Sequence, residues 1–395
     1  MKITALVSLA AAVLALTEAS PIARRPHSEG HAINLTRNAN YKPNAKAQIA
    51  KLNKRYPNLQ ILAASTGSVP LTDVSPDLEY YGSVSVGTPA QVVKLDFDTG
   101  SSDIWFPSST CTTTACKAHT RFNSAKSSTY TKDGRSWTIS YGDGSSASGI
   151  LGSDIVSVGG ISVRQTIGLA TKESSQFGSS PEDGLFGLGF DTIESVSGVK
   201  TFMDNAIAAG VLAQPVVSVF LPSERLFNGL GGQYLFGGID STKYTGSLTY
   251  VPVTEKGYWQ ILVQDASFNG VSLGQTSQGI VDTGTTLIIV GDAAAAAIHA
   301  KISGSVNDST NGWLVPCSVS TSTANVGFKL GGTTFNVPVA DLAYESLGDG
   351  SGNCISGVQG GQDGLWILGD VFIKNNYCVF SQTSSPSIGI APLAH

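Results

Sequence analysis

Charged side chains are scarce in this chain, because Asp, Glu, Lys and Arg together make up only 13% of its 395 residues. Glycine is abundant instead, with 45 residues, and runs of serine and threonine recur between short apolar stretches. So little charge and so many turn-forming residues are not typical of a coiled coil or a disordered chain. We therefore expect a globular, β-rich protein that is long enough for two domains of ordinary size.

Long apolar runs are missing beyond the N-terminus. Residues 3–16 form the one such run, after the positive charge of Lys2 and before a small-residue site at 17–19, a pattern typical of a secretory signal. No later stretch reaches the roughly 18 apolar residues that a membrane span needs. We interpret residues 1–19 as a signal peptide and expect a secreted, extracellular protein with no membrane partner. An uncleaved amphipathic N-terminus is the alternative.

The sequence contains no Cys-x-x-Cys pair and its five histidines are scattered, so we expect no metal and no cofactor. Five cysteines leave at least one without a partner in a secreted chain. Cys111 and Cys116 are close enough to close a small loop, and Cys317 and Cys354 could close a larger one. Cys378 lies in a strand-like apolar run, which favours a buried free thiol.

The charges that are present are divided unevenly along the chain. Residues 1–63 carry nine of the 24 basic side chains and two of the 29 acidic ones. Residues 64–395 therefore hold 15 basic and 27 acidic side chains, a formal net charge of −12. A basic N-terminal segment before an acidic remainder indicates that residues 20–63 are a pro-segment, which electrostatic attraction holds on the rest of the protein. The alternative is that this segment is a passive solvated linker. The acidic body argues against nucleic acid as a partner.

Short strand-like runs, separated by turn signals, begin near residue 78. The clearest predicted strands are residues 80–86, 92–97 and 137–141. Helical patterns are few, and they fall at residues 45–55, 199–213 and 293–302. Two sequons, at Asn34 and Asn307, are potential glycan sites, and the first would leave with the pro-segment.

A weak internal repeat relates the two halves of the chain. Residues 98–102 (DTGSS) return 184 residues later as residues 282–286 (DTGTT), and each copy follows an apolar, strand-like stretch. A second signature, an apolar pair before glycine, follows each copy. Two copies of this pattern predict two similar lobes. With a boundary near residue 250, the lobes are residues 64–250 and 251–395.

The repeated Asp-Thr-Gly run has a chemical logic. Glycine permits a tight loop, and the threonine or serine hydroxyls can bond locally and hold it. One such loop from each lobe would bring Asp98 and Asp282 together. Two carboxyl groups so close share one proton, because both cannot easily ionise. The ionised member can then activate a water that attacks a peptide carbonyl, while the protonated member donates to the carbonyl oxygen. One copy alone would be read as an ordinary turn.

With these motifs the chain resembles the pepsin-like aspartic proteases, and most of all the rhizopuspepsin-type fungal enzymes, whose established chemistry is that shared-proton mechanism. The resemblance covers nearly all of residues 35–395. It rests on residues 40–43 (NYKP), 80–82 (YYG), 97–102 (FDTGSS), 139–145 (ISYGDGS), 183–189 (DGLFGLG), 280–285 (IVDTGT) and 366–370 (WILGD). It implies an all-β, bilobal pepsin-like fold, in which two β-barrel-like lobes flank an active-site cleft.

The resemblance also implies roles for single residues in and around the pair Asp98 and Asp282, the catalytic dyad. Asp98 and Asp282 would bind the attacking water. Ser101 and Thr285 would hydrogen-bond this pair from outside, and Gly284 would border the substrate.

The resemblance further predicts a mobile hairpin flap that closes over the substrate. Tyr141, Gly142 and Asp143 would form it, and the Tyr141 hydroxyl would contact Trp105. Core packing is the alternative for Trp105, and an ordinary hairpin position is the alternative for Tyr141. The pairs Cys111–Cys116 and Cys317–Cys354 match the family's disulfides, whereas Cys378 departs from its pattern.

These observations predict a secreted, monomeric aspartic endopeptidase that cleaves polypeptide substrates in acid. The pro-segment would inhibit it, with Lys54 neutralising the dyad, and the precursor would convert itself near Ala64. The runner-up is a catalytically inactive pepsin-like binding protein, which would be expected to lose an Asp or Tyr141. A polysaccharide-active protein with two carboxylates is a third class, but its grooves carry clustered aromatics, and only 8% of this chain is aromatic.

Two acidic residues predict substrate specificity. Asp96 precedes Asp98 by two residues, which puts both side chains on one strand face, and Asp143 follows Tyr141 by two. The resemblance places Asp96 and Asp143 at the pocket for the residue before the scissile bond, with Leu185 as an apolar wall. We therefore expect cleavage after Lys as well as after large apolar residues. The alternative is that Asp143 completes a turn and Asp96 bonds locally.

Overall fold

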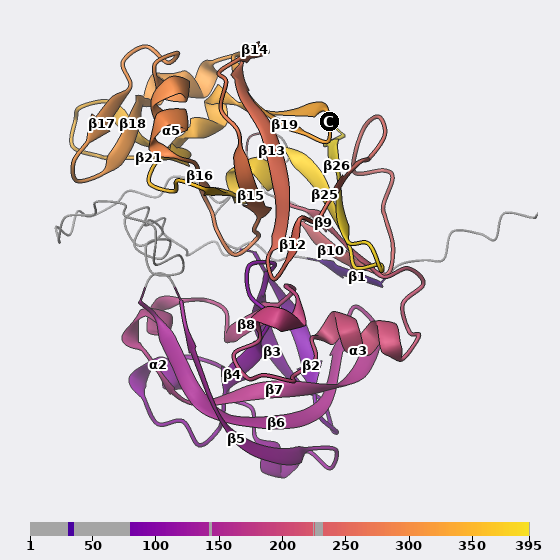
Figure 1. Ribbon diagram of the computed structural model, residues 1–395. Helices are drawn as coiled ribbons and strands as arrows, with labels where there is room; N and C mark the ends of the chain where they lie inside the picture. The colour runs from indigo at the N-terminus through magenta and orange to yellow at the C-terminus, as the bar shows by residue number, and fades with distance from the viewer. Residues whose placement is uncertain (1–30, 35–79, 142–143, 224, 226–231, 395) are drawn as a thin grey trace, which may run out of the picture.

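The computed structural model describes residues 31–34, 80–141, 144–223, 225 and 232–394. Its strands form two lobes, with the earlier part of the chain below and the later part above in Figure 1. The all-β, bilobal pepsin-like fold predicted from the sequence is confirmed. The predicted helix at 45–55 lies outside the described residues.

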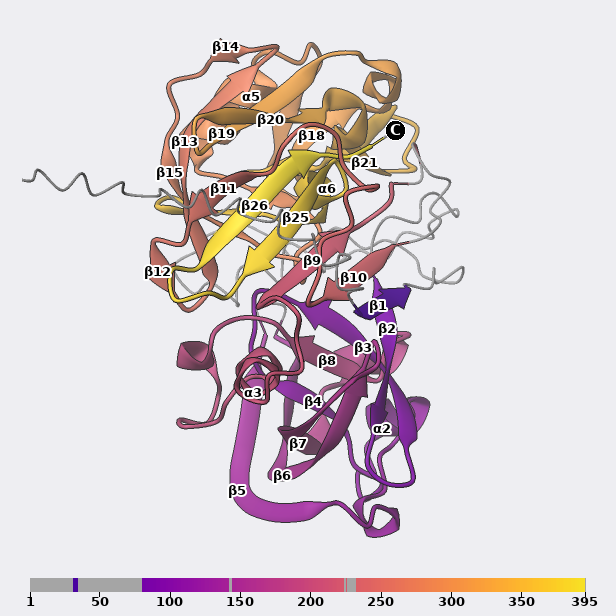
Figure 2. The same cartoon turned by 90° about the vertical axis from the view of Figure 1, so that its right-hand side faces the viewer.

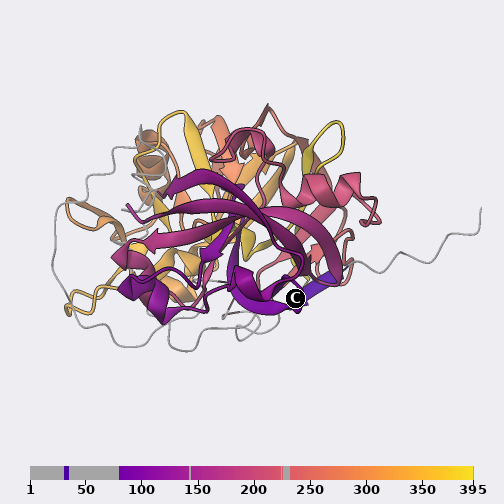
Figure 3. The same cartoon turned by 90° about the horizontal axis from the view of Figure 1, so that it is seen from below.

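The lower lobe is built on a seven-stranded sheet in the order β2-β3-β8-β4-β7-β6-β5. Its strands are β2 (Tyr81–Val86), β3 (Gln91–Asp98), β4 (Ile104–Pro107), β5 (Thr131–Ser140), β6 (Ser146–Val158), β7 (Ile161–Glu173) and β8 (Gly184–Gly187). Strand β3 pairs in parallel with β8, so Asp98 ends a strand that is buried in mid-sheet. Figure 3 views this lobe from below, with its long strands crossing in front of the other half.

The upper lobe contains a nine-stranded and a four-stranded sheet. The larger sheet holds β12 (Glu255–Lys256), β13 (Trp259–Phe268), β14 (Val271–Ser272), β15 (Ser277–Val281), β16 (Ile288–Ile289), β19 (Asn325–Leu330), β20 (Thr333–Pro338), β23 (Val358–Gln359) and β24 (Leu365–Leu368). The smaller holds β17 (Val306–Asp308), β18 (Gly312–Pro316), β21 (Ala343–Ser346) and β22 (Asn353–Ser356). Strand β15 pairs in parallel with β24, as β3 does with β8, so both Asp-Thr-Gly runs follow equivalent strand pairs.

A six-stranded sheet joins the two halves of the chain (Figure 2). Its strands, in spatial order, are β1 (His31–Asn34), β10 (Gln233–Phe236), β9 (Val216–Phe220), β25 (Asn376–Ser381), β26 (Ser387–Pro392) and β11 (Thr249–Pro252). The two halves of the chain thus share this sheet, and the lobe boundary near residue 250 stays a prediction.

Helices are short and few among the described residues. They are α2 (Thr114–Ala118), α3 (Phe202–Ala208), α5 (Asp292–His299) and α6 (Asp370–Ile373), with 3₁₀ turns η1 (Ser124–Lys126), η2 (Ser175–Ser179), η3 (Asp191–Ile193), η4 (Cys317–Thr321) and η5 (Val339–Leu342). The helix predicted at 199–213 is shorter, because Thr201 and Asp204 form a capping box at its start and Gly210, at φ +64°, follows its end.

The cysteines pair as the family resemblance implied. Cys111 bonds Cys116, and Cys317 bonds Cys354. Cys378 is free and fully buried in β25, as predicted. Within the described residues, no helix is long and apolar enough to cross a membrane.

Candidate active site

Two loops meet where the lobes face each other, one after β3 and one after β15. Their aspartates, Asp98 and Asp282, have no solvent-exposed surface. The loops touch closely: a Cβ added to Gly284 would lie 2.2 Å from the Oδ1 of Asp98. Real atoms cannot approach so closely, so only glycine fits at position 284. The structure therefore brings together the two carboxylates that the sequence repeat singled out.

Each loop holds its own carboxylate with the same pair of donors. The glycine two residues after the aspartate donates its amide hydrogen to Oδ1, at 2.8 Å in the first loop and 3.0 Å in the second. Ser101 donates its hydroxyl to the Oδ2 of Asp98 at 2.5 Å, and Thr285 does the same for Asp282 at 2.6 Å. These donors fix the orientation of both carboxylates.

The threonines of the two runs bond across the interface between the loops. The amide of Thr99 donates to the Oγ1 of Thr283, and the amide of Thr283 donates to the Oγ1 of Thr99, each at 3.0 Å. The two hydroxyls donate onward to the carbonyls of Val281, at 3.0 Å, and Phe97, at 2.7 Å. The local hydroxyl bonds predicted from the sequence are those of Ser101 and Thr285, whereas the side chains of Thr99 and Thr283 reach the opposite loop.

Two carboxylates in this arrangement can divide the work of acid and base. Two carboxyl groups held this close can share one proton, because like charges at close range repel in a buried site. The ionised group can take a proton from a water molecule, and the protonated group can donate one to an acceptor.

Tyr141 follows directly after β5, at the turn of the β5–β6 hairpin, and the structure brings it to Trp105. The indole Nε1 of Trp105 donates a hydrogen bond to the hydroxyl of Tyr141, and both residues are buried. Trp105 also packs on Trp137 and Phe177, with ring centroids 5.8 and 5.0 Å apart. Trp105 thus contacts the hairpin and belongs to the core at once. Gly142 and Asp143 lie outside the described residues.

A cavity of about 270 Å³ opens beside Tyr141 and Ser101. Four of the residues that line this cavity were not among the site residues predicted from the sequence: Asp103, Ile193, Ser195 and Tyr258. Asp103 lies only five residues beyond Asp98, so its place in the first motif could have drawn attention to it, whereas the other three come from distant segments.

Asp103 connects β5, the first strand of the hairpin, to the segment that contains Ser195. It accepts hydrogen bonds from the indole of Trp137 at 2.7 Å and from the amide and hydroxyl of Ser195 at 3.1 and 2.9 Å. Burial raises the pKa of Asp103. Burial also raises the pKa of neighbouring Glu194 to about 9, with nearby carboxylates adding to the effect, so Glu194 is uncharged in acid.

The structure places the other predicted pocket residues on adjacent strands. Asp96 lies opposite Leu185 in β8, and it is 8% exposed. Leu185 belongs to the same apolar cluster as Tyr141. Tyr234, which the sequence did not reveal, stacks on Phe97 with centroids 5.0 Å apart and donates its hydroxyl to the Phe97 carbonyl at 3.0 Å. This hydrogen bond restrains the backbone at Phe97, the residue before Asp98.

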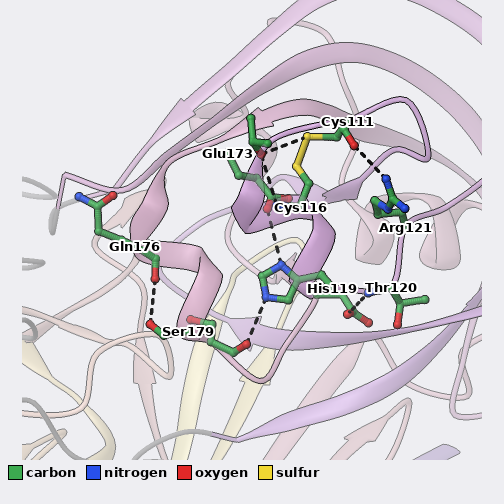
Figure 4. Close-up of polar contacts among 11 residues, drawn as sticks. Cys111, Cys116, His119, Thr120, Arg121, Glu173, Gln176 and Ser179 are labelled. Atoms are coloured by element: carbon green, nitrogen blue, oxygen red, sulfur yellow. Dashed lines mark hydrogen bonds and ion pairs between the residues drawn. A yellow bond between two sulfur atoms is a disulfide. The ribbon is translucent and has the colours of Figure 1, made fainter.

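A buried ion pair stands behind the hairpin, where the loop after α2 meets the end of β7 (Figure 4). The Nδ1 of His119 lies 3.6 Å from the Oε2 of Glu173, with side-chain exposures of 4% and 0%. Its Nε2 lies 3.1 Å from the carbonyl of Ser180. No hydrogen-bond donor in the described part of the chain reaches either carboxylate oxygen of Glu173. The charge of His119 is therefore what compensates this carboxylate.

This ion pair supports the wall on which Tyr141 packs. Glu173 is followed directly by η2, whose Phe177 packs edge-on against Tyr141 with centroids 6.0 Å apart. Burial by itself would lower the pKa of His119, but Glu173, the Ser180 carbonyl and Asp183 together raise it above the usual 6.5.

The residues described, 31–34, 80–141, 144–223, 225 and 232–394, contain no group of three or more His, Cys, Asp or Glu side chains that could hold a metal ion. The two aspartates are instead surrounded by hydroxyl and amide donors, which suit carboxylates and their bound water rather than a cation.

Comparison with known proteins agrees with this geometry. A family model described as eukaryotic aspartyl protease matches residues 79–393. Rhizopuspepsin-2 of Rhizopus niveus is 45% identical to the chain, with all of both chains covered. Syncephapepsin of Syncephalastrum racemosum is 41% identical, with 99% of each chain covered. Pepsin A of Callithrix jacchus is 40% identical over 80% of this chain and 82% of its own. The resemblance predicted from the motifs is confirmed.

The crossed threonine bonds can be tested by removing one hydroxyl. Thr283→Val keeps the side-chain shape but leaves the buried amide of Thr99 without its acceptor. We expect the free energy of unfolding, measured in urea, to fall by about 1–3 kcal/mol for that unpaired group. Thr283→Ser keeps a hydroxyl and should recover most of the loss. Equal stability of the Val variant and the wild type would show that the crossed bonds contribute nothing.

The His119–Glu173 pair predicts a stability that declines above neutral pH. A histidine whose pKa is raised by folding stabilises fully below its unfolded pKa of about 6.5, and loses that contribution as pH rises through its folded value. Urea unfolding between pH 6 and 8.5 should show this fall in the free energy of unfolding of the wild type.

Two variants separate this ion pair from other titrating groups. His119→Asn removes the cation, and Glu173→Gln removes the buried anion that needs it. Both should flatten the decline in stability over the same pH range. If the slope of both variants matches that of the wild type, the pair does not set the pH dependence.

Proposed function

The chain belongs to the eukaryotic aspartyl protease family, and we propose that it is a secreted endopeptidase that cleaves polypeptides in acid with Asp98 and Asp282 as its catalytic pair. One observation carries the proposal: two fully buried carboxylates stand on loops so close that only glycine fits between them. We also propose that the active protein is a monomer and that it follows the secretory route that residues 1–19 indicate.

In the proposed mechanism the pair shares one proton and binds a water between its carboxyl groups. The ionised aspartate takes a proton from this water as its oxygen attacks the peptide carbonyl, and the other aspartate donates its proton to the carbonyl oxygen. The aspartate that took the water's proton then donates it to the leaving nitrogen, while the other aspartate takes a proton from a hydroxyl of the tetrahedral intermediate. The carbonyl re-forms, the C–N bond breaks, and the pair again holds one shared proton. Ser101 and Thr285 support the orientation of both groups throughout, because each binds the outer oxygen of its aspartate.

The pair is tested by replacing either aspartate with its amide. Asp98→Asn and Asp282→Asn should each lower kcat/KM on a denatured protein substrate by at least about 10²-fold, because an amide cannot shuttle the proton. Asp349→Asn, at an exposed aspartate, is the matched control and should retain full activity. Activity of the wild type should peak in acid, since one carboxyl must stay protonated.

Several outcomes would contradict this assignment. Retention of more than a few per cent of activity in either variant, with contamination excluded, would remove the pair from catalysis. An optimum near pH 8 would rule out the shared proton. A folded wild type with no activity on any peptide would favour an inactive binding protein instead.

The position of β1 supports the proposal that the chain is made as a precursor. Residues 31–34 lie within the basic segment 20–63, and β1 pairs antiparallel with β10 at the edge of the six-stranded sheet. The pro-segment would thus be attached to the body by backbone pairing as well as by the attraction between its positive charge and an acidic body. Lys54 and Ala64 lie outside the described residues, so their roles in inhibition and processing stay predictions.

Self-activation predicts that acid converts the precursor. Acidification protonates carboxylates of the body and weakens their attraction to the pro-segment, so the precursor should shorten to a form beginning near Ala64. We expect N-terminal sequencing to find this product at pH 3–4 within the wild-type sample and not in the Asp98→Asn precursor. Conversion of the Asp98→Asn precursor at the same rate, with other proteases excluded, would show that the precursor does not cleave itself with this aspartate pair.

The proposed specificity for Lys rests on Asp96 and Asp143. The ratio of cleavage after Lys to cleavage after Phe should fall about 10-fold in Asp143→Thr, since a lost charge-assisted bond is worth about 1.5–3 kcal/mol. Asp143→Glu, which keeps the charge, is the matched control. In the wild type the Lys activity should also fade as pH falls and the carboxylates protonate. An unchanged ratio in Asp143→Thr would remove this residue from the specificity argument.

A further inference from the structure

Asn307 lies on the outermost strand of the four-stranded sheet, whose order is β17-β18-β22-β21. It is exposed, and residues 307–309 read Asn-Asp-Ser, an acceptor sequence for N-linked glycans in secreted proteins. Among the described residues, no strand pairs with the outer edge of β17, and its side chain Val306 is apolar and 51% exposed. An unprotected strand edge of this kind is a site of unwanted pairing between chains.

The hairpin around this sequon is well ordered. The Oδ1 of Asp308 accepts hydrogen bonds from the amides of Thr310 and Asn311, at 3.0 and 2.7 Å, and from the Asn311 side chain at 2.8 Å. The Asp308 carboxylate is therefore engaged in shaping the turn. Ser309, which completes the sequon, is exposed beside it. The folded hairpin thus presents both required side chains to solvent.

A hollow of about 530 Å³ lies beside the hairpin, and Asn307, Ser309 and Trp313 are among the residues that line it. Asn307 pairs directly with Trp313 across the two strands, so their side chains stand on the same face of the sheet. The indole of Trp313 is stacked on His299, with centroids 4.3 Å apart and ring planes 10° apart.

The buried side chain of Gln359 fixes the backbone of this tryptophan. It accepts from the amide of Trp313 at 2.8 Å and donates to the Trp313 carbonyl at 2.9 Å. A rigid, partly apolar hollow therefore opens directly beside the acceptor asparagine.

We propose that Asn307 carries an N-linked oligosaccharide whose first sugar lies in this hollow against Trp313. The inference rests on the secretory route of the proposed function. In the attachment step the Nδ2 of Asn307 forms a bond to C1 of the sugar of a lipid-diphosphate-linked oligosaccharide and loses one proton. The bond from C1 to the diphosphate oxygen breaks, and the lipid diphosphate leaves. The attached glycan covers the free edge of β17, and its apolar sugar face packs on the indole.

The test uses the full chain, expressed in a eukaryotic host that secretes it. Mass spectrometry of the tryptic peptide 302–329 reads the modification directly, after the glycan has been trimmed to one N-acetylglucosamine. We expect this peptide to carry the mass of that sugar in the wild type and in Ser309→Thr, which keeps the sequon. We expect the unmodified mass in Ser309→Ala, which removes the sequon and leaves Asn307 itself unchanged.

Packing of the first sugar is tested by thermal unfolding of the same samples. The trimmed wild type should unfold at a midpoint a few degrees above Ser309→Ala, roughly what 1 kcal/mol gives for a chain of this size. The trimmed Ser309→Thr variant should match the wild type. In a Trp313→Leu background the two sequon states should unfold at the same midpoint, because the indole is gone.

The outcomes distinguish this inference from the function on which it rests. A secreted, active enzyme whose peptide 302–329 is unmodified overturns the glycan alone. A chain that remains in the cell with residues 1–19 attached overturns the secretory proposal and the glycan together. A modified Asn307 with no difference in midpoint between trimmed wild type and Ser309→Ala overturns the packing on Trp313.

Discussion

The rest of the structure depends on holding two carboxyl groups against each other in a buried site. Two like charges repel at close range in a buried site, so the loops that carry them need bonds that keep them together. Thr99 and Thr283 supply these bonds, because each accepts from the other's amide and donates to a carbonyl of the opposite strand. No side chain at position 284 could be accommodated between the loops.

The surrounding layers hold this contact from both sides. Equivalent parallel pairs, β3 with β8 and β15 with β24, deliver the two aspartates to the same junction. The shared six-stranded sheet reaches the first loop through Tyr234, whose hydroxyl binds the carbonyl of Phe97. In the first lobe, the hydrogen bond from Trp105 to the Tyr141 hydroxyl holds the base of the β5–β6 hairpin. The His119–Glu173 ion pair forms only when the His119 imidazole is protonated, so it is favoured at acid pH.

Much of the site could be predicted from the sequence because its parts are local. The Asp-Thr-Gly runs, their second-position glycines and the hydroxyls of Ser101 and Thr285 lie within a few residues of the carboxylates that they hold. The strands predicted at 80–86 and 92–97 appear as β2 and β3 within one residue at each end, because β-branched and aromatic residues fill both runs and turn residues at 87–89 separate them. The disulfide pairs followed from family resemblance and not from spacing.

What the sequence did not show depends on contacts between distant segments. Asp103 meets Ser195 across 92 residues, and His119 meets Glu173, which is 54 positions further along the chain, so neither pairing has a local pattern. The crossed threonine bonds connect residues 184 apart. The predicted helix at 199–213 was too long because apolar spacing continues past Gly210, where a left-handed backbone ends the helix.

The central claim is that Asp98 and Asp282 share a single proton, and neutron diffraction on deuterated crystals grown near pH 5 measures this most directly. The account predicts one deuteron on the two carboxyl groups together, with a water bound between them. It also predicts that the Ser101 and Thr285 hydroxyls point at the outer oxygens of their own aspartates. Two deuterons on the carboxyl groups, or none, would contradict it.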